Sequence, residues 1–256
     1  MTKEISKLKN NIEYIYKQNK NTPRMALCLN FSINEPEEKP GIYSLVSRLL
    51  LQGTKKYNSE ELANEFEKYA IDFSSDLFPN YLRLNFLCLN EDFSKAIELM
   101  NEVITNSTFD EIEKEKLKLK GEITAELDSP RAKAMDSYCK AMYENHYYGN
   151  SMTKVLESLD SITKDDVIKA YNLILHDSKK ALAIVGTLDK NEILPLIEET
   201  LGQLPSSNDN NFNITKPELN AKKEIINIKP DLNQAHIIKG WQVQTYGEED
   251  YPAFIL

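Results

Sequence analysis

The segment YLRLNFLCLN, residues 81–90, alternates apolar and polar side chains along its length. Because successive side chains of a β-strand point to opposite faces, this alternation places four apolar side chains on one face: Leu82, Leu84, Phe86 and Cys88. The segment IDFSSDLF, residues 71–78, also has the composition of a strand. A sheet with one apolar face needs a second layer to cover that face. We therefore expect a half-buried sheet with helices packed against it.

Other segments supply the remaining strands and helices of this expected fold. Strand patterns occur at residues 4–18, broken at Asn10-Asn11, and at residues 24–33 and 180–186. Helical spacing of apolar residues and capping residues such as Asn58 predict the following helices: residues 40–53, 58–70, 91–104, 110–127, 131–143, 164–175 and 189–202. These elements do not alternate strictly, so the expected fold class is α+β rather than a parallel βαβ sheet.

Charge and cysteine content exclude several classes of function. The 256 residues carry a net charge of −9, which argues against binding to nucleic acid or to an anionic membrane surface. The three cysteines lack metal-ligand spacing and are expected to be reduced, buried thiols. The N-terminal segment lacks the apolar region of a signal peptide, and no apolar run approaches the roughly 18 residues that cross a membrane. We expect a cytoplasmic protein.

A change of composition marks an expected domain boundary. Residues 205–221 are rich in Asn, Ser and Pro and have the composition of a linker between a first domain, residues 1–204, and residues 222–256. The last segment contains two strand patterns, KKEIINIK and QAHIIKGWQV, and the start of a helix, EEDYPAFIL. An isolated hairpin is marginally stable in water. We expect this segment to pack on the first domain or on a second copy of the chain.

The predicted helix at residues 40–53 contains a recognisable spacing of glycines. The spacing is that of the pattern G-x-x-H-x-x-E-H-x-x-x-x-G-T. Its glycines and threonine are present as Gly41, Gly53 and Thr54, and its His, Glu and His positions are occupied by Ser44, Ser47 and Arg48. We call these six positions the motif frame. This spacing resembles the insulinase, pitrilysin and mitochondrial processing peptidase family of zinc peptidases, the inverzincins. The segments ENHYYGNSMTKVLESLDSITKDDVIKAY and ALAIVGTLDKNEILPLIEETLGQLP are similar to later parts of the same domain. The resemblance implies a processing-peptidase-like domain, a mainly antiparallel sheet packed against helices, followed by the truncated start of a second similar domain.

The resemblance also implies which chemistry is missing. In active members two histidines bind Zn²⁺, the glutamate between them activates a water molecule, and a distant glutamate is the third ligand. Here Ser44 and Arg48 stand at the histidine positions and Ser47 at the glutamate position. Glu122 stands at the third-ligand position and is the surviving ligand, or else an ordinary solvated residue of a charged helix. We expect Arg48 to pair with Glu122 in place of the metal.

These replacements predict a protein without zinc and without the family's catalysis. Arg48 has no lone pair to offer a metal, and a serine at position 47 cannot act as the general base. The three histidines, His146, His176 and His236, are far apart in sequence and are expected to have structural or surface roles. The leading hypothesis is a pseudo-peptidase that serves as the partner subunit of an active zinc peptidase. The alternatives are a structural or assembly remnant, which could pair with itself, and an active zinc peptidase, which is the weakest.

A peptide-binding role is the remaining functional expectation. In the family, peptides add as a strand beside the metal helix, and residues 71–77 match that place, with Phe73, Ser74, Ser75 and Asp76 at its centre. Strand addition depends on backbone groups more than on particular side chains, so it can persist without catalysis. The alternative is an ordinary edge strand that Asp72 and Asp76 protect from pairing.

Overall fold

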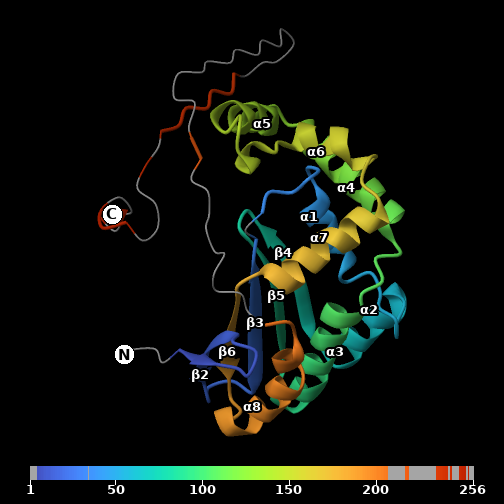
Figure 1. The fold of residues 1–256 in the computed structure, drawn as a ribbon, viewed down its shortest axis with the longest axis vertical. Helices are drawn as coiled ribbons and strands as arrows, with labels where there is room; N and C mark the ends of the chain where they lie inside the picture. Colours follow the sequence, from blue (N-terminus) through green and yellow to red (C-terminus); the bar gives the residue numbers. More distant parts are fainter. Residues whose placement is uncertain are drawn as a thin grey trace. The chain divides into compact units, whose positions relative to one another are not determined.

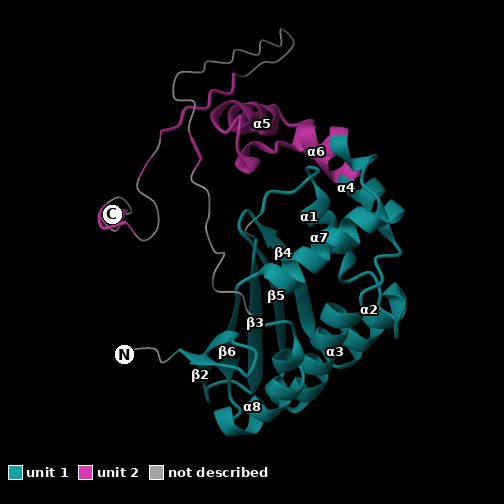
Figure 2. Ribbon diagram, in the orientation of Figure 1, with its two compact units in different colours: residues 1–119, 158–214 teal, residues 120–157, 215–256 magenta. Residues whose placement is uncertain are grey.

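The computed structural model describes residues 5–33, 35–206, 217–218, 235–241, 243, 248–251 and 253 (Figure 1). Two compact units make up the chain: residues 1–119 with 158–214, and residues 120–157 with 215–256 (Figure 2). The predicted linker lies mostly, and the predicted strand at residues 222–229 wholly, outside the described residues. The proposed boundary at residues 205–221 therefore stays a prediction. The second predicted strand, QAHIIKGWQV, is wrong where the structure describes it, because residues 235–241 and 243 are not in a strand. Of the predicted helix at residues 248–256, Tyr251 and Ala253 are helical.

The first unit is built on a six-stranded sheet whose order is β1-β2-β6-β3-β5-β4. The strands are β1 (Ser6–Lys7), β2 (Glu13–Gln18), β3 (Arg24–Ser32), β4 (Asp72–Phe78), β5 (Tyr81–Leu89) and β6 (Lys180–Gly186). Neighbouring strands are antiparallel except β2 and β6, which are parallel. The expected α+β class with a mainly antiparallel sheet is confirmed. In this sheet β4 is an edge strand.

One face of the sheet carries the apolar core. The four side chains predicted to share a face of β5, Leu82, Leu84, Phe86 and Cys88, are all buried. Alternate residues of the neighbouring strands continue this face, including Leu27 and Leu29 on β3 and Leu182 and Ile184 on β6. The period of two in the sequence therefore identified the buried face correctly.

Helices of the first unit pack over this sheet (Figure 1). They are α1 (Ile42–Leu49), α2 (Ser59–Lys68), α3 (Phe93–Asn106), α7 (Lys164–Asp177) and α8 (Lys190–Glu199), with the short 3₁₀ turns η1 (Asn90–Asp92) and η3 (Leu201–Gln203). The predicted cap of α2 is confirmed, because Asn58 and Glu61 form a capping box. α1 lies against both α7 and β4, so the predicted motif helix is held between a second helix and the sheet edge.

The second unit contains helical segments, whereas its described residues 217–218, 235–241 and 243 are in neither a helix nor a strand. It contains α5 (Pro130–Met142), the 3₁₀ turn η2 (Tyr147–Gly149), the second part of α4 (Ile112–Leu127) and most of α6 (Met152–Leu159). The sequence patterns did not predict α6. Within the described part of the chain, no helix is long and apolar enough to cross a membrane.

Candidate functional site

The glycines of the motif frame hold backbone conformations that other residues rarely adopt. Gly41, which precedes α1, has a φ of 97°, and Gly53, which follows α1, has a φ of 131°. The Glu37 carboxylate accepts hydrogen bonds from the backbone N–H groups of Gly41 (3.0 Å) and Tyr43 (3.3 Å). It thereby satisfies the first turn of α1, where donors lack partners in the helix. The backbone conformation of Gly41 and the carboxylate of Glu37 therefore together fix the start of α1.

The end of the motif frame turns the chain toward α2. The Thr54 hydroxyl accepts hydrogen bonds from the N–H groups of Lys56 (3.1 Å) and Tyr57 (3.2 Å). A Cβ atom at Gly53 would lie 3.3 Å from the carbonyl oxygen of Tyr57. The glycine and threonine of the frame thus have structural roles that do not involve metal chemistry.

Ser47, at the position of the catalytic glutamate, joins α1 to the edge strand. Its side chain is 5% exposed. Its hydroxyl lies 3.0 Å from the carbonyl oxygen of Ser75 and 2.9 Å from the Ser75 hydroxyl, with hydrogen bonds to both. These bonds engage Ser47 with β4.

Arg48, at the position of the second histidine, forms an ion pair with Glu115 on α4. The Arg48 Nη1 atom lies 3.6 Å from Glu115 Oε2, and Lys118 Nζ lies 2.6 Å from Glu115 Oε1. The Glu115 side chain is 3% exposed and that of Arg48 is 30% exposed. A buried carboxylate is stable only with such partners. Glu122 follows about two turns later on α4 but falls in the second unit, so its predicted pairing with Arg48 stays a prediction.

Glu115 is not among the predicted site residues, although the sequence carries a signal for it. Along α4 the buried residues recur at helical spacing, and Glu115 falls among them: Ile112, Glu115, Lys116, Leu119 and Ile123. A glutamate on an apolar stripe is uncommon unless it is paired. The pattern of α4 therefore indicates a buried, paired carboxylate at position 115.

The three side chains at the catalytic positions do not fit a zinc ion. A protonated guanidinium has no lone pair, and that of Arg48 is engaged with Glu115. Serine hydroxyls are poor zinc ligands, and that of Ser47 is bonded to Ser75. Ser44 is half-buried one helical turn before Arg48. Across the described ranges, no group of three or more His, Cys, Asp or Glu side chains could hold a metal ion.

β4 lies beside α1 and has two different faces. On one face Ser75 meets Ser47, and Phe73 stacks on Phe66 of α2 with ring centroids 5.0 Å apart. On the other face Asp76 accepts a hydrogen bond from Asn85 (3.0 Å) and pairs with Arg83 (3.4 Å), both on β5.

This arrangement bears on the alternative that charged residues protect the edge. Because Arg83 and Asn85 hold the Asp76 carboxylate, Asp76 is less able to repel an incoming strand than a solvated carboxylate would be. Asp72, at the start of β4, is exposed. Charge thus protects the middle of β4 only weakly, but the carbonyl oxygen of Ser75 there already accepts the hydrogen bond from Ser47.

The histidines lie in different settings. His146 Nδ1 accepts a hydrogen bond from the N–H of Tyr148 at the start of η2, as suits the expected structural turn. His176 is exposed near the end of α7, where it lines a cavity, and His236 is exposed.

Comparison with known proteins gives matches along the chain. Residues 12–155 match the family model described as Insulinase (Peptidase family M16), and residues 161–256 match the model described as Peptidase M16 inactive domain. An uncharacterized zinc protease of Rickettsia felis is 24% identical over 249 residues, which cover 94% of this chain and 59% of that protein. A probable inactive metalloprotease of Bacillus subtilis, YmfF, is 24% identical over 240 residues, which cover 82% of this chain and 54% of that protein. The chain thus spans between half and two thirds of these relatives.

Solved structures share the fold. A peptidase M16 inactive domain from Pseudomonas fluorescens superposes with a TM-score of 0.73 at 17% identity, covering 85% of this chain and 53% of that chain. The ferredoxin protease FusC, solved in complex with Arabidopsis ferredoxin, superposes with a TM-score of 0.69 at 15% identity, covering 85% of this chain and 24% of that chain. The relatives therefore include proteins named as proteases, a protein named as inactive, and a structure that holds a protein ligand.

Proposed function

Because the chain belongs to the insulinase family of peptidases, M16, we propose that it is a non-catalytic member that binds a peptide or a partner protein. One observation carries this proposal: the side chains at the catalytic positions are engaged in other contacts. Ser47 is bonded to Ser75, and Arg48 is paired with Glu115. The resemblance to a probable inactive metalloprotease supports the same proposal.

The proposed absence of catalysis follows from the chemistry of these side chains. A zinc ion placed beside Arg48 would be repelled by the guanidinium, which stays protonated at any physiological pH. Without the metal no water is activated, and Ser47 has no basic group to remove a proton. We propose that the chain carries no zinc cofactor at this position.

The proposed binding role rests on β4. An edge strand has alternate N–H and C=O groups without partners in its own sheet, and an extended peptide can pair with them. The hydrogen bond from Ser47 already engages the Ser75 carbonyl oxygen and holds the middle of β4 against α1, so a peptide would pair with the backbone groups on either side of it or displace this bond. The ferredoxin complex of FusC shows that a relative of this fold engages a protein, and we propose that this chain engages an active family member or a peptide.

Metal analysis of the full chain tests the non-catalytic part of the proposal. The chain is purified, incubated with zinc chloride, freed of loosely bound metal and analysed by mass spectrometry. We expect no stoichiometric zinc and no hydrolysis of unstructured peptides. About one bound zinc per chain, together with hydrolysis that a chelator abolishes, would show that the chain is an active peptidase.

Peptide binding is tested separately with labelled extended peptides. Fluorescence anisotropy compares each peptide with a copy methylated at alternate backbone nitrogens, because methylation removes the N–H groups that pair with an edge strand. We expect methylation in one register to abolish binding and methylation in the other register to preserve it. Equal binding in both registers, or no binding of any peptide, would contradict strand addition. Copurification of the chain from its own cells with an H-x-x-E-H protein tests the partner.

A further inference from the structure

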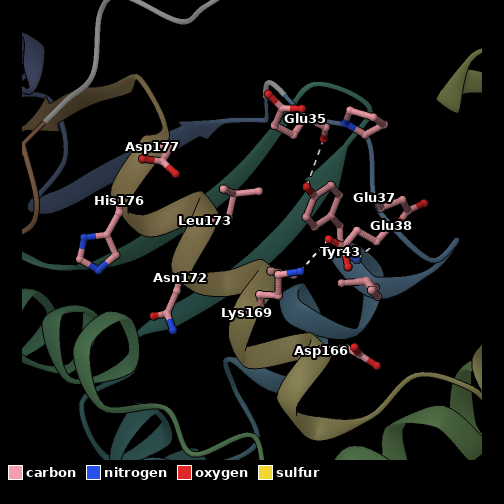
Figure 3. Close-up of a pocket in the computed structure, with 13 residues that line it drawn as sticks. Glu35, Glu37, Glu38, Tyr43, Asp166, Lys169, Asn172, Leu173, His176 and Asp177 are labelled. Atoms are coloured by element: carbon pink, nitrogen blue, oxygen red, sulfur yellow. Dashed lines mark hydrogen bonds and ion pairs between the residues drawn. The ribbon is translucent and has the colours of Figure 1, made fainter.

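A cavity of about 530 Å³ lies between the loop before α1 and one face of α7, within the first unit (Figure 3). This volume falls in the range of small-molecule binding sites, which is roughly 300–1,000 Å³. Part of its wall is apolar, with Ile42 and Tyr43 from α1 and Ala170 and Leu173 from α7. None of the lining residues belongs to β4 or to the catalytic positions of the motif frame.

Tyr43 is held in place at the wall of this cavity. It is 6% exposed, and its hydroxyl donates a hydrogen bond to the carbonyl oxygen of Glu35 (3.1 Å). Burial, and then the nearby charges of Glu37, Glu35 and Glu38, raise the pKa of Tyr43 to about 12, so the ring stays neutral. The cavity therefore has a fixed aromatic wall.

Five carboxylates also line the cavity, and three of them have partners. Glu38 pairs with Lys169 (2.7 Å), and Asp166 pairs with Lys39 (2.6 Å). The third, Glu37, accepts the two backbone hydrogen bonds at the start of α1. The negative charges of these three residues are therefore compensated by lysines or by backbone N–H groups of the protein itself.

The other two carboxylates, Glu35 and Asp177, are exposed and have no hydrogen bond or ion pair to a side chain in the described part of the structure. Both also line a smaller adjoining cavity of about 20 Å³, together with Tyr43 and Leu173. Figure 3 shows Leu173 projecting in the region between the two acids. Burial lowers the pKa of Lys180 to about 8, and the charge of Asp177 opposes this shift because it favours the protonated lysine. Two negative charges thus flank an apolar surface at one end of the large cavity.

We propose that this cavity binds an alkyl cation, the ammonium or guanidinium group at the end of an aliphatic stem. The cationic head would lie between Glu35 and Asp177, where charge-assisted hydrogen bonds are strong. The stem would lie on Leu173, Tyr43 and Ile42, as the methylene groups of lysine and arginine commonly lie on apolar surface. Such a group comes from a lysine or arginine side chain of a peptide, or from a free alkylamine. The proposal does not depend on strand addition at β4.

Calorimetric titration of the full chain with three probes tests this proposal. The probes are Nα-acetyl-lysine methylamide, its uncharged analogue Nα-acetyl-norleucine methylamide, and 1,5-diaminopentane. We expect saturable binding of the lysine probe, at least about tenfold weaker binding of the norleucine probe, and weaker binding of the lysine probe as salt rises. Tighter binding of the lysine probe than of the diamine would identify a peptide side chain as the source of the cation, and the reverse would identify a free amine.

A double variant and a charge-matched control complete the test. In E35Q/D177N both acids become neutral amides of nearly the same shape, and we expect the affinity for the lysine probe to fall about tenfold or more. The control, E67Q/E157Q, removes two exposed carboxylates that do not line the cavity, and we expect its affinity to match that of the unmodified chain. Equal affinity for the lysine and norleucine probes, or undiminished binding by E35Q/D177N, would overturn the proposal. So would the absence of saturable binding by both cationic probes.

Discussion

The ion pair between Arg48 and Glu115 gives the sharpest test of how the motif frame is stabilised without a metal. Replacing Arg48 by methionine keeps an unbranched side chain of similar length and removes the charge. The Glu115 carboxylate, 3% exposed, would then keep Lys118 as its remaining described cation. Removing one partner of a fully buried pair destabilises a protein by about 3–5 kcal/mol. Because Arg48 is 30% exposed and the atoms lie 3.6 Å apart, we expect a smaller effect, about 1–3 kcal/mol.

The measurement is the free energy of unfolding by urea, with the thermal midpoint as a second readout. For a chain of this size each kcal/mol corresponds to about 2–4 °C in the midpoint. The second variant, R48M/E115Q, removes the buried charge that R48M leaves behind. We expect it to recover about 1 kcal/mol relative to R48M, because a neutral amide costs less to bury than a carboxylate.

A matched control separates burial from simple loss of an ion pair. Lys56 and Glu98 form a pair of nearly the same length, 3.5 Å, but both side chains are more than half exposed. Exposed pairs contribute about 0–1 kcal/mol, so K56M should change the stability less than R48M does. If R48M is as stable as the unmodified chain, or if R48M/E115Q is no more stable than R48M, then the pair does not stabilise this region as we infer.

Three further predictions concern the same unit. S47A should lower the free energy of unfolding by about 1 kcal/mol in urea titrations, because the buried hydrogen bonds to Ser75 are lost, and an unchanged value would contradict this. The G41A variant should lose about 1–2 kcal/mol in the same assay, because a φ of 97° is strained for alanine, whereas a neutral effect would mean that the backbone relaxes there. Asp166 has a pKa lowered from 3.8 to about 2, chiefly by Lys39, so its charged form stabilises the fold above about pH 4 and this stabilisation is lost as pH falls toward 2. D166N should therefore be less stable than the unmodified chain at pH 6, and the difference should shrink between pH 4 and pH 2 in thermal scans; a difference independent of pH would refute the assignment.

Local patterns in the sequence predicted the strands and most helices because those patterns arise from neighbouring residues. The alternation in β5 and the cap at Asn58 depend on residues within a few positions of one another, and both are confirmed. The helix α6 was missed. Its sequence carries a signal that went unused, because Met152, Val155, Leu156 and Leu159 recur at the spacing of an amphipathic helix.

The contacts at the candidate site could be predicted only in part, because they join distant parts of the chain. The frame identified Ser47 and Arg48 as occupants of the catalytic positions, but not the partners of these side chains. The partner of Ser47 is Ser75, and the described partner of Arg48 is Glu115. The cavity beside α7 was also invisible in the sequence, since it requires the loop before α1 to meet residues more than a hundred positions later, as in the pair of Lys39 with Asp166.

The motif frame persists without its metal ligands because its positions serve two separable purposes. Gly41 and Gly53 set the ends of α1 through positive φ angles that other residues rarely adopt. The ligand positions instead supply charge. Beside the position of the second histidine, α4 presents a buried carboxylate, Glu115, that requires a cationic partner. Arg48 supplies one positive charge at the same place, opposite Glu115. Arg48 and Lys118 together compensate the buried Glu115 carboxylate, so the arginine at a former ligand position contributes to the contact between α1 and α4.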